Sequence, residues 1–204
     1  MHISEGVLSA PALFAGAVLA VGGTVIGLKK LDIHNIPQAG ILSAAFFVAS
    51  LIHIPIGPSS IHLILNGMVG FFLGWVAFPA ILTALVLQAI MFQFGGITTL
   101  GVNTIIMAGP AVLCYYIFSP FIQKKPWICI AASFACGSTA VFLGALLLAS
   151  FLVFSDKHFL EISMVVVIAH LPVMVIEGLI TTFCVLFLRK VRPSILPGYL
   201  SGSG

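Results

Sequence analysis

Residues 127–154 read WICIAASFACGSTAVFLGALLLASFLVF, a run that contains no charged side chain. About 20 consecutive apolar residues are enough for a helix to cross the hydrocarbon core of a bilayer. A helix also satisfies its own backbone hydrogen bonds in lipid, which other open structures cannot do. This stretch therefore predicts a membrane-spanning helix, and it decides the fold class.

The rest of the chain has the same character, with 61% hydrophobic and 6% charged residues and a mean hydropathy of +1.26. Soluble domains carry about 25% charged residues, so an ordinary globular fold is excluded. We predict an all-α polytopic membrane protein with about seven transmembrane helices. The predicted helices cover residues 8–28, 38–53, 60–76, 78–94, 102–122, 127–154 and 160–188. The second, third and fourth are short, so incomplete spans or tight hairpins are open alternatives.

The placement of positive charge predicts the orientation, because cytoplasmic loops are rich in Lys and Arg. With the N-terminus outside and the C-terminus cytoplasmic, seven of the eight basic residues lie inside. The one left outside is Lys157. The seven on the inner side are Lys29, Lys30, Lys124, Lys125, Arg189, Lys190 and Arg192.

Residues 1–196 are expected to form one transmembrane substrate-binding domain. The tail 197–204 is Gly/Ser-rich and expected to be flexible, and its last four residues resemble a vector-derived scar. The first residues carry Glu5 and no Lys or Arg, which argues against a signal peptide. The chelate described below needs Met1 to be retained with a free amine.

Several function classes are excluded by missing motifs. The chain has no G-x-x-x-x-G-K-[ST] sequence, so it cannot hydrolyse ATP with a P-loop. It has no H-E-x-x-H or G-x-S-x-G motif and only five acidic residues, so we predict that it is not an enzyme. No basic cluster suggests nucleic acid as a partner. The four cysteines lack C-x-x-C spacing and are expected to be small buried hydrophobes.

The opening Met1-His2 is a candidate metal chelate. The terminal amine, the His2 backbone nitrogen and the His2 ring Nδ1 can bind one ion through two fused rings. A plane of nitrogens suits Ni(II) or Cu(II). The alternative is that His2 is a solvated terminal residue.

His62 is the candidate fourth ligand, since it is predicted to open the helix 60–76 on the outer side. Asn66 follows four residues later and would share its helix face, while Ser60 can cap the helix. A structural histidine bonded to a backbone carbonyl is the alternative. His53 also lies near the outer face and is a weaker candidate.

The loop 94–103 contains paired glycines, Gly95-Gly96, which permit close backbone approach. Thr99 and Asn103 in this loop are candidates to hold a ligand histidine in place. The alternative is a plain connecting turn.

His170 and Glu177 are ionisable residues inside the predicted helix 160–188, with Pro172 between them. Intramembrane ionisable residues commonly have a functional role. A proton relay and a packing role are both open. Gly70-x-x-x-Gly74 predicts close helix packing, either internal or against a partner. Gln88 is predicted to bond between helices rather than to bind metal.

Three stretches together resemble the metal-binding M component (CbiM/NikM) of energy-coupling factor (ECF) transporters for cobalt and nickel. They are Met1–Gly6, Ser60–Gly67 and Phe92–Asn103. The resemblance implies seven helices with an inserted N-terminus, and a square plane formed by the Met1 amine, the His2 backbone and ring nitrogens, and the His62 ring. It also implies a transmembrane coupling subunit, a cytoplasmic ATPase pair and a small accessory membrane subunit. The location implied is the cytoplasmic membrane of a prokaryote.

The sequence around His62, His-Leu-Ile-Leu-Asn-Gly, looks more like the nickel branch of this family than the cobalt branch. We therefore expect a substrate-binding component for ATP-driven uptake of Ni(II), with Co(II) as the alternative. No organic cofactor is expected. A stand-alone proton-coupled metal carrier is the rival class, although the inverted repeat common in such carriers is not evident.

Overall fold

The computed structural model describes residues 2–51, 53–56 and 59–197, and of residues 53–56 and 59–61 only the backbone. The helices are α1 (Ala10–Lys29), α2 (Ile36–Ala49), α3 (Asn66–Leu73), α4 (Ala77–Phe92), α5 (Leu100–Phe118), α6 (Pro126–Ser155), α7 (Leu160–Ala169) and α8 (Leu171–Val191). Two strands, β1 (His53–Ile56) and β2 (Ser59–His62), form an antiparallel hairpin. Short 3₁₀ helices cover Ile33–Asn35, Gly74–Val76, Ser119–Phe121, Lys157–Phe159 and Pro193–Ile195.

Within the described residues, five helical stretches are long and apolar enough to cross a membrane, and Ile33–Ala49 is a shorter apolar one. This confirms a helical, polytopic membrane protein. Proline stands in the first turn of α1, α2, α6 and α8, where its missing N–H is tolerated and its φ is already helical. The sequence thus sets where several helices begin.

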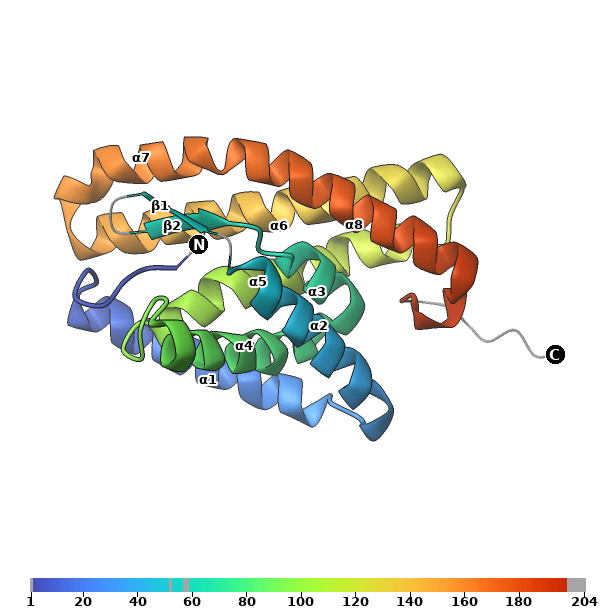
Figure 1. Cartoon of the computed structure of the whole chain (residues 1–204), viewed down its shortest axis with the longest axis horizontal. Coiled ribbons are helices and arrows are strands. Elements are labelled where there is room, and N and C mark those ends of the chain that lie inside the picture. The colour runs from blue at the N-terminus through green and yellow to red at the C-terminus, as the bar shows by residue number, and fades with distance from the viewer. Residues whose placement is uncertain (1, 52, 57–58, 198–204) are drawn as a thin grey trace.

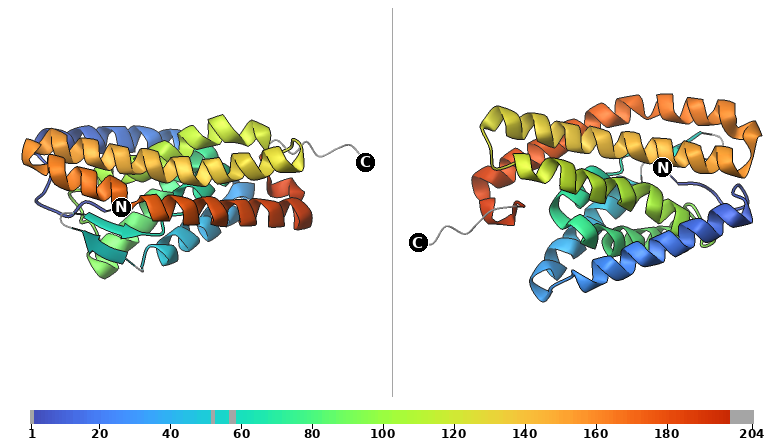
Figure 2. Two further views of the ribbon diagram at one scale, coloured as in Figure 1. Left: turned by 90° about the horizontal axis from the view of Figure 1, so that it is seen from above. Right: turned by 180° about the vertical axis from the view of Figure 1, so that it is seen from behind.

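The helices run back and forth between two ends of an elongated bundle (Figures 1 and 2). One end gathers residues 2–9, the loop after α4 and the turn between α6 and α7. The opposite end gathers the α1–α2 connection, the α5–α6 turn and the segment after α8. There Arg189 donates a hydrogen bond to the Lys124 carbonyl at 2.8 Å, which ties two of these connections together.

The hairpin corrects the prediction that every membrane segment is helical. α2 ends at Ala49, and residues 60–62 of the predicted helix 60–76 form part of strand β2 instead. The sequence 53–58, His-Ile-Pro-Ile-Gly-Pro, cannot continue a helix, because proline lacks the amide hydrogen and clashes with the preceding turn.

His62 therefore does not open a helix. α3 begins at Asn66, so His62 and Asn66 do not share a helix face, and Ser60 does not cap it. The residue before α3 is Leu65, which has a left-handed backbone with φ of 55°. The prediction of a helix from residue 60 was wrong because the apolar run alone cannot separate a buried strand from a helix.

The predicted helix 160–188 is broken at His170 into α7 and α8. Pro172 explains the break, since it removes one backbone hydrogen bond and its ring crowds the carbonyl four residues earlier. His170 caps both helices at the break and is fully buried.

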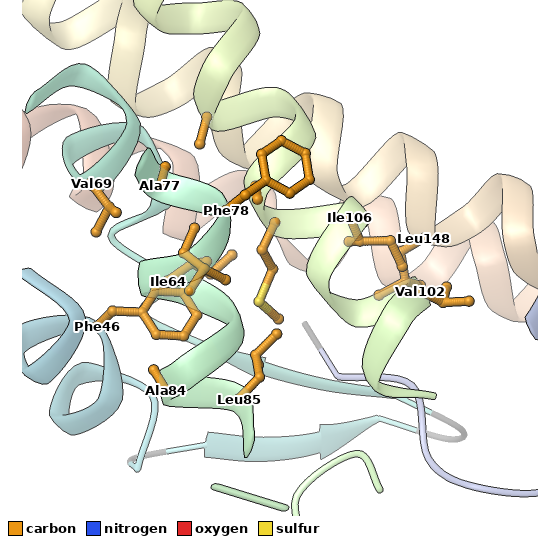
Figure 3. Packing of buried hydrophobic residues seen from close by; sticks show 14 of the residues in the cluster. Phe46, Ile64, Val69, Ala77, Phe78, Ala84, Leu85, Val102, Ile106 and Leu148 are labelled. Atoms are coloured by element: carbon orange, nitrogen blue, oxygen red, sulfur yellow. The ribbon is translucent and has the colours of Figure 1, made fainter. Parts of the chain in front are cut away.

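The main apolar core lies between α2, α4, α5 and α6 (Figure 3). Ile64, in the segment between β2 and α3, belongs to this cluster together with Phe46 and Leu85. All three side chains are at most 2% exposed. The segment that follows His62 is consequently anchored by its own side chain in the bundle core.

Glycines permit the closest helix contacts. A Cβ added at Gly70 would lie 2.3 Å from the Ala111 carbonyl oxygen on α5. The predicted close packing at Gly70 is confirmed as an internal contact. Of the four cysteines, Cys114, Cys129 and Cys136 are buried free thiols and Cys184 is half-buried, so the prediction holds for three.

We expect Gly70→Ala to destabilise the bundle by about 1–3 kcal/mol, because the new methyl group meets backbone that cannot move aside. Thermal unfolding in detergent measures the effect. Gly22→Ala on α1 is the matched control, since nothing lies within 4 Å of its added Cβ. Equal melting temperatures for the two variants would contradict the packing argument.

Candidate metal centre

His2 and Ile3 are buried at the end of the bundle that holds the loop after α4, where the side chain of Asn103 fixes the path of the chain. The Ile3 amide donates to Asn103 Oδ1 at 2.9 Å, and Asn103 Nδ2 donates to the Ile3 carbonyl at 3.2 Å. One side-chain amide thus satisfies both backbone groups of Ile3. This places the preceding residue, His2, in the interior, where it is 5% exposed.

Gln88 on α4 orients the His2 ring. Its Nε2 donates to Ser50 Oγ and, at 3.4 Å, to the Phe47 carbonyl, both on or next to α2. Its Oε1 therefore faces His2 Nε2, 2.8 Å away. Because a carbonyl oxygen only accepts, His2 Nε2 carries the hydrogen and His2 Nδ1 keeps its lone pair.

The His62 ring is oriented in the same way by the Leu63 carbonyl. His62 Nδ1 lies 2.7 Å from that oxygen and must donate to it. Burial lowers the pKa of His62 well below its ordinary value, so the ring is neutral at pH 7. The neutral ring with hydrogen on Nδ1 has its lone pair on Nε2.

The two lone pairs converge. His62 Nε2 lies 3.0 Å from His2 Nδ1, and the ring centroids are 4.7 Å apart. Nitrogen ligands bind transition metals at about 2.0–2.1 Å, so two neighbouring donors of a square plane are about 2.8–3.0 Å apart. The pair has the spacing of adjacent ligands in such a plane.

The loop after α4 closes over the N-terminal segment. Gly95 has φ of +75°, and a Cβ there would lie 2.7 Å from Asn103 Nδ2. A Cβ at Gly96 would lie 2.0 Å from Glu5. The Glu5 carboxylate accepts the Thr98 amide at 3.0 Å and the Thr98 hydroxyl at 3.2 Å, and the Thr98 amide lowers the pKa of Glu5. Gly95 thus leaves room for the Asn103 side chain, and Gly96 leaves room for Glu5.

The predicted site residues fall into three groups. His2 and His62 come together, and Thr99 accepts from Asn103 at 3.2 Å beside them. Asn103 holds the backbone of Ile3, the residue next to His2. Met1 and the side chains of Ser60 and His53 lie outside the described residues; the His53 backbone pairs with that of His62 in the hairpin.

Asn66, His170 and Glu177 are buried around this centre without being placed as ligands. Asn66 donates to carbonyls of α5 and α6, Met107 at 3.1 Å and Ala140 at 3.4 Å, which is a packing role. His170 Nδ1 lies 2.7 Å from the Val166 carbonyl. Glu177 accepts backbone amides just after His62.

Two contacts of the centre were missed in the sequence. Gln88 was expected to bond between helices, which is confirmed by its contacts to α2, but its bond to His2 was not anticipated. A buried amide in the otherwise apolar α4 was the available indication. The hydrogen bonds between Glu5 and Thr98 were not indicated by the sequence, because both residue types are common on protein surfaces.

A multi-pass helical bundle that holds two converging imidazole nitrogens near one end has the composition of a membrane protein that handles a metal ion. The family model for the cobalt uptake substrate-specific transmembrane region, CbiM, matches residues 2–195. The chain belongs to the CbiM family, whose members are membrane components of metal uptake.

A protein of Haemophilus influenzae whose name describes metal transport is 43% identical over 199 residues, covering 96% of this chain and 97% of that protein. A crystal structure of a transition metal transporter superposes with a TM-score of 0.77 at 27% identity, covering 94% of this chain and 93% of the other.

Two longer relatives carry this region fused to another. The fused cobalt transport protein CbiMQ of Methanocorpusculum labreanum is 31% identical over 96% of this chain and 36% of its own length. The fused nickel transport protein NikMN of Rhodobacter capsulatus is 36% identical over 55% of this chain and 35% of its own length.

We expect Asn103→Leu to release the N-terminal segment, because both backbone bonds of Ile3 are lost. Removing a buried hydrogen bond costs about 1–3 kcal/mol, so hydrogen exchange of the Ile3 amide should accelerate roughly 10-fold or more. Thr104→Val is the control, since the buried Thr104 hydroxyl donates to the Leu100 carbonyl of its own helix. Unchanged exchange at Ile3 in Asn103→Leu would show that the segment is held by other contacts.

Proposed function

We propose that this protein is the substrate-binding component of an ATP-driven ECF-type uptake transporter, and that it captures Ni(II) for delivery to the cytoplasm. The observation that carries the proposal is the convergence of His2 Nδ1 and His62 Nε2 at 3.0 Å, with both outer ring nitrogens bonded to carbonyl oxygens. A hydrogen-bonded outer nitrogen fixes the tautomer and orientation of a ligand histidine.

The proposed ligand set is the Met1 amine, the His2 backbone nitrogen, His2 Nδ1 and His62 Nε2. The first three belong to consecutive positions of the chain and close two fused rings around one ion. His62 then completes the plane next to the His2 ring. The buried, hydrogen-bonded path of residues 2 and 3 supports this set, because it brings the start of the chain to His62.

Nickel is favoured by the chemistry of the set and by the His-Leu-Ile-Leu-Asn-Gly sequence at residues 62–67. Four nitrogens in a plane suit Ni(II), and ionisation of the His2 amide is readily driven by it. Co(II) is the second candidate, because the matching family model describes cobalt uptake.

The proposed topology has seven spans, an external N-terminus and a cytoplasmic C-terminus, with residues 1–196 as one domain. Three connections lie together at one end of the bundle: α1–α2, α5–α6 and the segment after α8 (Figure 1). These parts of the chain carry seven of the eight basic residues, which supports the proposed orientation. Cytoplasmic ends of membrane proteins are enriched in such charges. The metal centre would then lie at the outer end of the bundle.

Transport requires partners in this proposal, because the sequence lacks a P-loop motif. They are a transmembrane coupling subunit, a cytoplasmic ATPase pair and a small accessory membrane subunit, in the cytoplasmic membrane of a prokaryote. The fused relatives support membrane partners, since their names join the M region to a Q or an N region.

Nickel titration of the purified protein tests the ligand set. We expect one Ni(II) per chain in the wild type, and a loss of at least 100-fold in affinity in His2→Ala and His62→Ala, as each removes a donor. One extra residue before Met1 should have the same effect. His158→Ala is the control, because this exposed ring bonds to Asp156. Wild-type affinity in the extended protein would refute the terminal chelate.

Competition between metals tests the proposed substrate. We expect a tenfold excess of Co(II) to leave most of the nickel bound, because a planar four-nitrogen site suits Ni(II) better. Equilibrium dialysis with both ions, followed by metal analysis, measures the ratio. Preferential retention of cobalt would assign the protein to the cobalt branch instead.

A further inference from the structure

Glu177 on α8 connects a distant helix to the metal centre. It is fully buried, and its Oε1 accepts the Ile64 amide at 2.5 Å and the Leu65 amide at 2.8 Å. These amides lie two and three residues after His62. The other acidic residues of the chain, all within the described part, are exposed: Glu5, Asp32, Asp156 and Glu161.

We propose that Glu177 is a positioning residue of the metal centre: its carboxylate holds residues 63–65 so that His62 faces His2, and its negative charge balances the bound ion. This inference rests on the proposed function. Glu177 is not a ligand in this arrangement, and it acts through the backbone that carries His62.

The segment after His62 needs such a contact. Leu65 has φ of 55°, a left-handed conformation that costs a non-glycine residue about 1–2 kcal/mol. No side chain caps the start of α3 in the usual way. Successive amides in this kind of turn form a concave site that binds an anion, and the Glu177 carboxylate occupies it.

The same segment determines which nitrogen of His62 faces His2. The Leu63 carbonyl accepts from His62 Nδ1 at 2.7 Å and so keeps the lone pair on Nε2. Ile64 and Leu65, held by Glu177, are the next two residues. Rotation of this segment would move the Leu63 carbonyl and release the His62 ring.

Close glycine contacts fix the backbone of Glu177. A Cβ on Gly137 of α6 would lie 2.6 Å from the Glu177 carbonyl oxygen, and a Cβ on Gly67 of α3 would lie 2.7 Å from the Gly137 Cα. The helices α3, α6 and α8 therefore meet at van der Waals distance beside the carboxylate. This close packing fixes the position of the Glu177 backbone, and its side chain can then hold residues 63–65 in place.

Charge supplies the second part of the inference. A dication bound to one ionised amide and three neutral nitrogens leaves the site with one positive charge. Buried charge is costly unless a counter-charge lies nearby. When ionised, Glu177 supplies one negative charge, and within the described part of the chain its Oε2 has no hydrogen-bond partner.

Substitution of Glu177 tests both parts. Glu177→Gln keeps an acceptor oxygen and loses the charge, while Glu177→Ala loses both. Changes to groups that support metal ligands typically cost about 10–100-fold in affinity. We expect nickel affinity to fall about 10-fold in Glu177→Gln and about 100-fold in Glu177→Ala. Thr181→Val is the control, a buried polar residue one turn further along α8.

Two further measurements distinguish a positioning role of Glu177 from a general effect on folding. The d–d absorption band of the nickel-saturated variants should stay at the wild-type position, because the four nitrogens are unchanged. In metal-free protein, the Ile64 and Leu65 amides should exchange hydrogen faster in Glu177→Ala than in Thr181→Val. A displaced band would make Glu177 a ligand and overturn the positioning role.

The outcomes separate this inference from the proposed function. If wild-type protein binds nickel tightly and Glu177→Ala titrates like Thr181→Val, the role of Glu177 is overturned and the chelate stands. If wild-type protein binds no nickel, the proposed function falls, and the charge-balancing role falls with it.

Discussion

The site depends on one constraint: two buried imidazoles each donate their outer N–H to a carbonyl oxygen, which turns both lone pairs inward. Gln88 acts on His2 and the Leu63 carbonyl acts on His62. Neutral nitrogens held 3.0 Å apart gain more from a shared cation than from each other. The surrounding bonds to Ser50, Asn103 and Glu177 then serve to keep these two acceptors and two rings in place.

The buried amide side chains of the bundle each have hydrogen-bond partners. In a bilayer an unsatisfied polar group is expensive, so each buried one needs an explanation. Gln88 bonds two helices and a histidine, and Asn66 bonds two helix carbonyls. Ile3 enters the interior with both of its backbone groups paired to Asn103. The apolar helices surround the site, while a few side-chain amides and one carboxylate fix the positions of the two histidine rings.

Much of the fold and part of the candidate site were predictable from the sequence. The apolar runs predicted the helical class and most helix positions. Met1-His2 and His62 were identified by donor chemistry and a family resemblance. The hairpin before His62 was not predicted, because hydrophobicity does not distinguish a buried strand from a helix. The bonds from Gln88 and Glu177 were not predictable either, since they join positions 86 and 113 residues apart.

The path of residues 2 and 3 has a consequence for biogenesis. Ile3 is fastened by Asn103, a partner 100 residues later in the chain, and His2 by Gln88. Synthesis proceeds from the N-terminus, so the first residues made must wait until α4 and α5 have been translated and inserted before they can dock. The His2 and His62 rings are consequently brought together and oriented only late in assembly.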